Sequence, residues 1–174
     1  MHATDPKGFT PMLLACCSGY MQTVLLLDGH GADPRAVCAD GTTALMMACG
    51  NCHGDIVRWL IDKNIDLDAV QHRNEGRTAL AISSGDQRRM LIEAGADFDA
   101  TDARGWTLLM HGCENGDLDN VRELIAAGAD TYVLADAADT YLPGESICAM
   151  DLATHGKHWD CVIAVAQARR DRHN

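Results

Sequence analysis

Short apolar segments with helical spacing recur along the chain, separated by polar turns rich in glycine and aspartate. In the stretch 56–61, apolar residues stand at positions i, i+1, i+4 and i+5, which places them on one face of a helix. The stretch 121–125 repeats part of this spacing. Neither stretch is apolar all round, so each predicts an amphipathic helix that must pack against a neighbour to bury its apolar face.

A tripeptide of glycine, any residue and threonine opens four of these segments. The threonines are spaced by 33, 35 and 29 residues, and in three of the four units an aspartate follows the threonine by 23 residues. A threonine before an apolar run predicts a helix N-cap, and a glycine just before the closing aspartate predicts a left-handed helix end. The four openings are Gly8-Phe9-Thr10, Gly41-Thr42-Thr43, Gly76-Arg77-Thr78 and Gly105-Trp106-Thr107. Each unit is therefore expected to be a helix pair that stacks on its neighbours.

These units resemble the ankyrin repeat family, whose period is about 33 residues and whose first helix opens with Thr-Pro-Leu-His-x-Ala. The matching segments are Thr10-Pro11-Met12-Leu13-Leu14-Ala15, Thr43-Ala44-Leu45-Met46-Met47-Ala48 and Thr78-Ala79-Leu80-Ala81-Ile82, with second-helix patterns at 53–61 and 116–125 and a diverged fifth unit at 148–163. The resemblance implies an all-α fold, an ankyrin-repeat solenoid of about five helix-pair repeats with β-hairpin-like fingers. Residues 1–174 then form a single ankyrin repeat domain, with repeats at about 5–37, 38–72, 73–101, 102–134 and 145–168.

The departures from the family pattern are also informative. The third repeat is four residues short between Thr78 and Asp97, so one of its helices should be about one turn long. Residues 131–147 form an insertion that predicts an unusually long finger. Residues 2–8 parallel residues 99–105, which fits either a piece of a longer array or a native start within a repeat.

The charge of the chain argues against several classes of partner. The 174 residues carry a formal net charge of −11, which opposes the attraction offered by nucleic acids and anionic membranes. No apolar run approaches the roughly 18 residues that a membrane span needs, and residues 1–8 show no secretion signal. We therefore expect a cytoplasmic or nuclear protein whose eight cysteines are reduced thiols.

The motif Cys49-Gly50-Asn51-Cys52-His53 fits the attachment pattern of c-type haem. The repeat register explains it more simply, because Cys49 falls at a small core position and His53 at a position where ankyrin repeats commonly have histidine. Cys52 stands where a glycine usually follows the first helix, so we expect a strained backbone there. No second Cys-x-x-Cys completes a zinc site, and His111 and Cys113 point to different helix faces. We expect no metal, no cofactor and no enzymatic activity.

The acidic residues are concentrated in one region. Residues 93–151 hold 13 acids and two bases, which accounts for the entire net charge. The simplest interpretation is a solvated face with ordinary turn aspartates. The alternative is a field that steers a basic partner, and it predicts a partner protein with a basic rim.

Candidate contact residues follow from the position after each repeat glycine, which the family resemblance places at the groove beside the fingers. We expect one partner site at Trp106, with its neighbours and the long finger, because an exposed aromatic side chain is a typical interface anchor. The alternatives are that Phe9 only covers an edge and that Trp106 folds onto the third repeat. Trp59 and Trp159 are expected to be packing residues. The full candidate set is Trp106, Arg104, Glu114, Asn115, Arg77, Phe9, Tyr132, Tyr141, Asp136 and Asp139.

These features favour a non-catalytic module or scaffold that binds a partner protein through its concave groove and fingers, as a monomer. The alternative is a small ankyrin-type regulator or inhibitor of one enzyme, such as a protein kinase. The inhibitors of cyclin-dependent kinases are also compact arrays with one shortened helix, although their short unit is the second repeat rather than the third.

Overall fold

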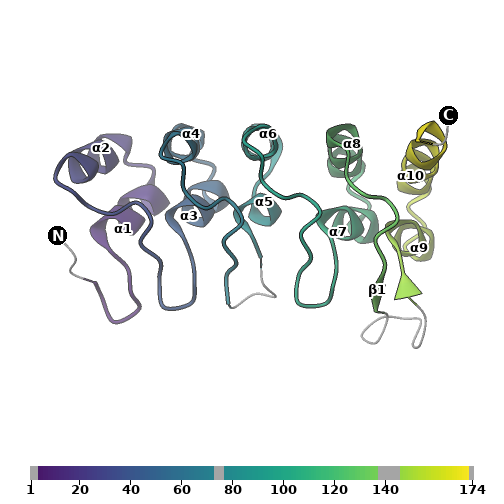
Figure 1. Cartoon of the computed structure of the whole chain (residues 1–174), viewed down its shortest axis with the longest axis horizontal. Helices are drawn as coiled ribbons and strands as arrows, with labels where there is room; N and C mark the ends of the chain where they lie inside the picture. Colours follow the sequence, from purple (N-terminus) through teal and green to yellow (C-terminus); the bar gives the residue numbers. More distant parts are fainter. Residues whose placement is uncertain (1–3, 73–76, 137–145, 173–174) are drawn as a thin grey trace. The chain divides into compact units, whose positions relative to one another are not determined.

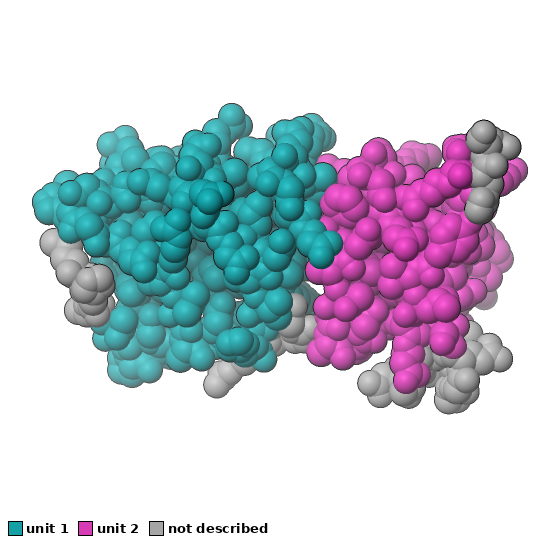
Figure 2. All heavy atoms as spheres, in the orientation of Figure 1, with its two compact units in different colours: residues 1–97 teal, residues 98–174 magenta. Residues whose placement is uncertain are grey.

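The computed structural model describes residues 4–72, 77–136 and 146–172 (Figure 1). The chain divides into two compact units, residues 1–97 and 98–174 (Figure 2). Unit 1 contains α1 (Pro11–Ser18), α2 (Met21–Gly29), α3 (Ala44–Gly50), α4 (Gly54–Asp62), α5 (Ala79–Ile82) and α6 (Gly85–Glu93). Unit 2 contains α7 (Leu108–Asn115), α8 (Leu118–Ala127), β1 (Ala135–Asp136), β2 (Ser146–Ile147), α9 (Ala149–His155) and α10 (Trp159–Asp171).

The threonines of the repeat motif begin the first helices, as expected. The Oγ1 atoms of Thr10 and Thr43 each accept from the backbone N–H three residues later at 3.2 Å. Thr78 and Thr107 do the same at 3.3 Å. In the fifth repeat Cys148 takes the threonine position, and its N–H donates instead to Asp151 Oδ2 at 2.9 Å. The repeated threonine thus starts the first helix of each of the first four repeats by satisfying a backbone donor.

The second helices of the first four repeats end in left-handed turns. Gly95 and Gly128 have φ values of 92° and 102°, a conformation that costs glycine little. In the second repeat, which lacks this glycine, Asn64 takes the position with φ 52°. These turns direct the chain from each second helix into the next finger.

The helices of each unit stack in two layers. In unit 1, α1 contacts α2 and α3, α3 contacts α4 and α5, and α4 contacts α6; in unit 2, α7 contacts α8 and α9, and α10 contacts α8 and α9. Within each unit, Figure 1 shows the first helices in one layer, with the second helices on one side of it and the fingers on the other. Leu13, Leu45 and Leu80 fill the core of unit 1, and Leu109 and Leu124 that of unit 2. This arrangement confirms the expected all-α ankyrin solenoid.

The third repeat is shortened as the sequence indicated. Its first helix, α5, has four residues, a single turn. On α6, the buried Arg88 occupies the position at which α2, α4 and α8 have Val24, Val57 and Val121, and its Nη2 atom donates to the Ser83 carbonyl at 2.6 Å. A polar side chain therefore replaces apolar packing in the repeat with the shortest helix.

We expect this repeat to be the weakest internal link of the array, because solenoid stability is close to a sum of repeat and nearest-neighbour contributions. Hydrogen exchange measured by NMR should show faster opening of the amides of residues 79–92 than of residues 118–125 in α8. Equal or slower exchange of residues 79–92 would contradict this prediction.

Candidate functional site

A single carboxylate shapes the finger that leads into α7. Asp102 Oδ1 accepts from the backbone N–H groups of Arg104 at 2.8 Å and Trp106 at 2.9 Å. The Asp102 N–H in turn donates to the Trp106 carbonyl at 2.9 Å. Asp5 makes the equivalent turn in the first finger through the N–H groups of Lys7 and Phe9. The aspartate therefore fixes the backbone on which Arg104 and Trp106 are carried.

The side chain of Trp106 lies inside unit 2. Only 2% of the residue is exposed, so the expectation of an exposed aromatic anchor is wrong. The Arg104 guanidinium lies over the indole at 4.4 Å, and the His111 ring packs beside it at 5.2 Å between centroids. His111 Nε2 lies 2.9 Å from Asp102 Oδ2. Trp106 thus supports Arg104, whose side chain remains 32% exposed.

The Asp102 carboxyl has a perturbed pKa. Burial raises its pKa, but hydrogen bonds from the Trp106 N–H, the His111 ring and the Arg104 N–H outweigh this effect, so the pKa lies below the ordinary value of 3.8. The carboxylate is therefore ionised at neutral pH and holds the finger in place.

The long finger lies beside this turn. Its strands β1 and β2 pair antiparallel, with Ala135 opposite Ile147. Ala135 is close to Gly105, since a Cβ added to the glycine would lie 3.8 Å from the alanine Cβ. Tyr132 is 44% and Leu134 64% exposed on the same finger, and Asp136 is exposed as well. Arg104 and the exposed side chains of the long finger are thus carried on adjacent fingers.

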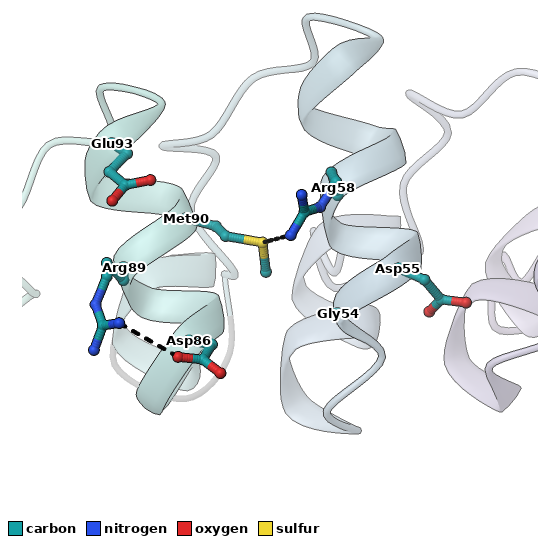
Figure 3. A pocket seen from close by; sticks show the side chains of 7 residues that line it. All are labelled: Gly54, Asp55, Arg58, Asp86, Arg89, Met90 and Glu93. Atoms are coloured by element: carbon teal, nitrogen blue, oxygen red, sulfur yellow. Dashed lines mark hydrogen bonds and ion pairs between the residues drawn. The ribbon is translucent and has the colours of Figure 1, made fainter.

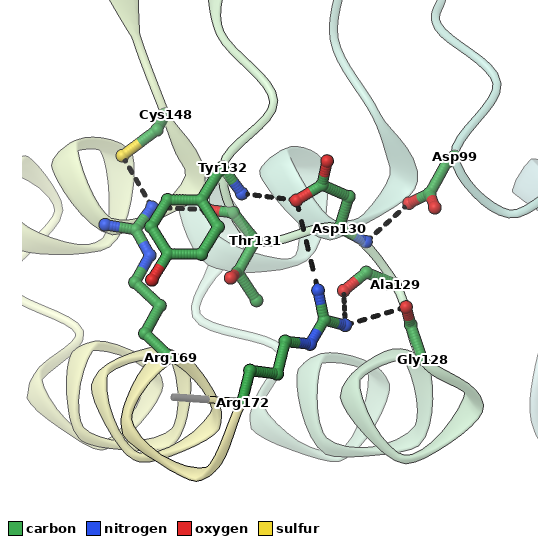
Figure 4. A network of polar contacts seen from close by, with 9 residues as sticks. All are labelled: Asp99, Gly128, Ala129, Asp130, Thr131, Tyr132, Cys148, Arg169 and Arg172. Atoms are coloured by element: carbon green, nitrogen blue, oxygen red, sulfur yellow. Dashed lines mark hydrogen bonds and ion pairs between the residues drawn. The ribbon is translucent and has the colours of Figure 1, made fainter. Parts of the chain in front are cut away.

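Arg169 of α10 and Arg172, which directly follows this helix, hold the base of the long finger (Figure 4). Arg169 lies 4.4 Å from the Tyr132 ring and donates to the Thr131 carbonyl. Arg172 donates to the carbonyls of Gly128 at 2.7 Å and Ala129 at 2.6 Å. These bases lie outside residues 93–151, so the local excess of acids is smaller in the folded protein than along the sequence.

The remaining candidate residues are spread over both units. Glu114 and Asn115 form the end of α7, roughly 10 Å along the helix from the Thr107 cap. Arg77 is exposed and Phe9 half-buried, and both belong to unit 1. Asp139 and Tyr141 lie outside the described residues.

The two tryptophans expected to pack behave differently. Trp59 is half-buried, with Lys63 Nζ at 5.2 Å from its ring. Trp159, however, is 58% exposed, so the packing expectation is wrong for this residue. Trp159 is the first residue of α10 and has no following helix pair to contact among the described residues.

A groove that the sequence did not indicate lies between α4 and α6 (Figure 3). It has a volume of about 530 Å³ and is lined by Gly54, Asp55, Arg58, Asp86, Arg89, Met90 and Glu93. Arg58 and Met90 point toward each other across it, with 3.6 Å between Nη2 and Sδ. Gly54 contributes no side chain to this space, and a Cβ added to it would lie 3.8 Å from Met90 Cε.

All eight cysteines are free thiols. Burial raises the pKa of Cys16, Cys49 and Cys113 to about 12 in each case. Cys52 is exposed and has the left-handed φ of 60° that its glycine-like position predicted. Within the described residues, no group of three or more His, Cys, Asp or Glu side chains is placed to hold a metal ion.

These differences predict an order of thiol reactivity. Alkylation requires the thiolate, so Cys52 should react with iodoacetamide at pH 8 at least tenfold faster than Cys16, Cys49 or Cys113. Mass spectrometry of timed digests measures the order. After denaturation without reductant all eight thiols should react, and a lower count or early labelling of Cys49 would refute the prediction.

No helix in the described part of the chain is long and apolar enough to cross a membrane.

Comparison with known families identifies the repeats. A family model described as ankyrin repeats in three copies matches residues 1–71, and a model of a single ankyrin repeat matches residues 104–136. The chain belongs to the ankyrin repeat family. Members of this family are in general protein–protein interaction modules and are generally non-catalytic.

Several curated proteins are similar to this ankyrin repeat protein. It is 35% identical over 130 residues to the B-cell lymphoma 3 protein homolog of Mus musculus, covering 70% of this chain and 29% of the relative. It is 34% identical over 118 residues to the B-cell lymphoma 3 protein of Homo sapiens, covering 63% of this chain and 26% of that relative. It is also 34% identical over 131 residues to palmitoyltransferase AKR1 of Lachancea kluyveri, covering 71% of this chain and 18% of that relative. The chain therefore spans less than a third of each relative.

Proposed function

We propose that this ankyrin repeat protein binds a partner protein through a surface on unit 2 formed by Arg104, Tyr132, Leu134 and Asp136, called here the finger site. The observation that carries the proposal is the fixed position of Arg104. Asp102 orders its backbone, and the buried Trp106 ring supports its guanidinium at 4.4 Å while leaving it partly exposed. A pre-ordered arginine loses little side-chain freedom on binding, and arginine is enriched among interface residues that dominate affinity.

The chemistry of the finger site suggests the kind of partner. Leu134 and Tyr132 offer apolar surface, while Asp99, Asp130 and Asp136 lie on the same fingers. The matching partner has an apolar patch with a basic rim and an acidic or carbonyl group for Arg104. We expect it in the cytoplasm or nucleus, where thiols stay reduced. The net charge of −11 argues against nucleic acid or an anionic membrane as the partner.

The test starts with immobilised protein as bait in a cell lysate, followed by mass spectrometry to identify the partner. With the purified partner, isothermal titration should show that Arg104→Ala and Leu134→Ala each cost about 1 to 2 kcal/mol of binding free energy. The matched control is Arg122→Ala, an exposed arginine on α8, which should change the affinity little. Unchanged affinity of both finger-site variants, with their fold intact by circular dichroism, would move the site elsewhere.

Salt dependence tests the role of the acidic side chains separately. The double change Asp136→Asn with Asp139→Asn should flatten the dependence of affinity on salt and cost little at high salt, because charges at the rim of an interface act mainly on association. A large loss at high salt would assign these carboxylates a direct contact instead.

The alternative function, a small regulator of one enzyme, stays a prediction. The feature that supports this alternative is the four-residue helix α5, since the small ankyrin-type inhibitors also have one shortened helix. The same bait experiment would support it if the captured partner were an enzyme whose activity the protein inhibits.

A further inference from the structure

The base of the long finger holds a half-buried guanidinium that has hydrogen-bond partners but no opposite charge. Arg169 of α10 donates through Nη2 to the Thr131 carbonyl, and the same atom lies 3.2 Å from Cys148 Sγ (Figure 4). Its Cζ atom lies 4.4 Å from the centre of the Tyr132 ring. Among the described residues, no carboxylate oxygen lies within 4.0 Å of the Arg169 nitrogens. A partly buried cation without an anionic partner is unfavourable, because burial removes part of its hydration.

The two carboxylates carried beside these residues bond to other groups. Asp130 Oδ1 accepts from the Tyr132 N–H at 2.9 Å, and Asp151 Oδ2 accepts from the Cys148 N–H at 2.9 Å. Each of them holds a backbone group in its own turn and forms no ion pair with Arg169. The protein therefore leaves the charge of this guanidinium without a counter-ion of its own.

Two buried polar atoms of the contacting pair Arg169 and Thr131 have no hydrogen-bond partner in the structure. One is Arg169 Nε, and the other is the hydroxyl oxygen of Thr131, a residue that is 1% exposed. Nearly all buried polar groups in proteins are paired, so two exceptions on one pair of contacting residues call for an explanation. The guanidinium Nε–H can only donate, and a threonine hydroxyl can also donate. The group that would satisfy both atoms is therefore a hydrogen-bond acceptor.

Neither residue is required here by the repeat fold. Thr131 stands three residues after the turn glycine, where the two preceding repeats have the apolar residues Leu67 and Phe98. Helix α10 has 13 residues, whereas α8 has ten, and Arg169 belongs to the additional turn. A hydroxyl at an otherwise apolar position and an arginine on an extended helix thus meet at one place in unit 2.

We infer that Arg169 and Thr131 form a binding site for a small monovalent anion such as chloride, called here the anion site. The anion accepts from Arg169 Nε–H and from the Thr131 hydroxyl, and its charge neutralises the guanidinium. A water molecule could accept the same two bonds, but it would leave the charge uncompensated. The ligand is small because both donor atoms are buried, and because the Tyr132 ring and Cys148 pack against the guanidinium.

An anion at this place would stabilise the base of the long finger. Arg169 holds the Thr131 carbonyl, and three residues later the same finger presents Leu134 to solvent. A ligand that binds the folded state and not the unfolded state raises the free energy of unfolding. The stability of the protein should therefore depend on chloride itself, and this inference holds whether or not the finger site binds a partner.

Thermal unfolding followed by circular dichroism tests the anion site. The wild type is compared in sodium chloride and in sodium gluconate at the same ionic strength, so that general screening of charge is equal. With chloride about tenfold above its dissociation constant, Tm should be at least about 3 °C higher than in gluconate. Thr131→Val and Arg169→Gln should each abolish this difference. Thr131→Val is expected to fold, because apolar side chains occupy this position in other repeats.

The matched controls are Thr154→Val and Arg170→Gln. Thr154 is exposed and its hydroxyl donates within its own helix at 2.8 Å, while the exposed Arg170 contacts only the Ala166 carbonyl of its own helix among the contacts described. Both variants should keep the full chloride effect. The width of the chloride NMR resonance gives a direct readout of binding, and the protein-induced broadening should be present in the wild type and both controls and lost in Thr131→Val.

Every other result contradicts the inference. Equal Tm values of the wild type in the two salts, without broadening of the chloride resonance, exclude the anion site. A chloride effect that survives both Thr131→Val and Arg169→Gln places the anion elsewhere. Loss of the effect in Arg169→Gln but not in the folded Thr131→Val would show that the hydroxyl is not a ligand, and loss in the controls as well would assign the effect to overall charge.

Discussion

Trp106→Ala is expected to lower the free energy of unfolding by about 3 to 5 kcal/mol, the usual cost of removing a large aromatic side chain from a core. The indole is 2% exposed, and the Arg104 guanidinium and the His111 ring both pack on it. Its removal leaves a cavity between the finger and α7. Urea denaturation followed by circular dichroism measures the loss.

The matched control for this prediction is Trp159→Ala. Trp159 is 58% exposed, so its loss should change the unfolding free energy by less than about 0.5 kcal/mol in dilute, monomeric protein. Similar effects of the two substitutions would show that Trp106 is not a core residue. Because Trp106→Ala acts through folding, loss of partner binding in that variant says nothing about a direct contact, and the finger site is better tested at Arg104 and Leu134.

The elements that the sequence predicted well depend on backbone chemistry at repeated positions. Thr43 starts α3 because its hydroxyl accepts from a free backbone N–H. Gly128 ends α8 because glycine adopts the left-handed conformation that the turn requires. The four-residue helix α5 follows directly from the missing residues of the third repeat. Such features are local, so the spacing of a few residue types was sufficient to place them.

The details of the candidate site depend on side-chain packing, which the repeat register does not contain. The register correctly placed Trp106 after a finger glycine, but it did not show that the indole turns inward beneath Arg104. It assigned Trp159 a packing role because this residue lies on a second helix, whereas in the described structure α10 contacts α8 and α9 and leaves Trp159 58% exposed.

The contacts of Arg169 and Arg172 could not be predicted from spacing. They reach Thr131 and Gly128 across 38 and 44 residues of sequence. A count of acids and bases along the chain therefore overstated the negative field at the base of the long finger, because folding brings two guanidinium groups there.

Asp102→Ala is expected to lower the free energy of unfolding by about 2 to 3 kcal/mol at pH 7. The substitution leaves the N–H groups of Arg104 and Trp106 and the His111 ring without the carboxylate that they contact, and hydrogen bonds to charged groups contribute about 1.5 to 3 kcal/mol. The matched control is Asp5→Ala, which removes the same two backbone bonds from an exposed turn that has no histidine partner among the described residues and should cost about 1 kcal/mol.

The pH dependence distinguishes the lost charge from a lost packing contact at Asp102. The pKa of this carboxyl is lower in the folded protein than the ordinary 3.8, so the unfolded state binds its proton first as the pH falls. The stabilisation is therefore fully present above about pH 5 and is lost as the pH falls below 3.8 and through the folded pKa. Urea denaturation of the wild type and Asp102→Ala between pH 7 and pH 3 should show their difference shrinking toward the acid end. A difference that stays constant over this range would mean that the ionised carboxylate does not hold the finger, and that Asp102 acts only by filling space.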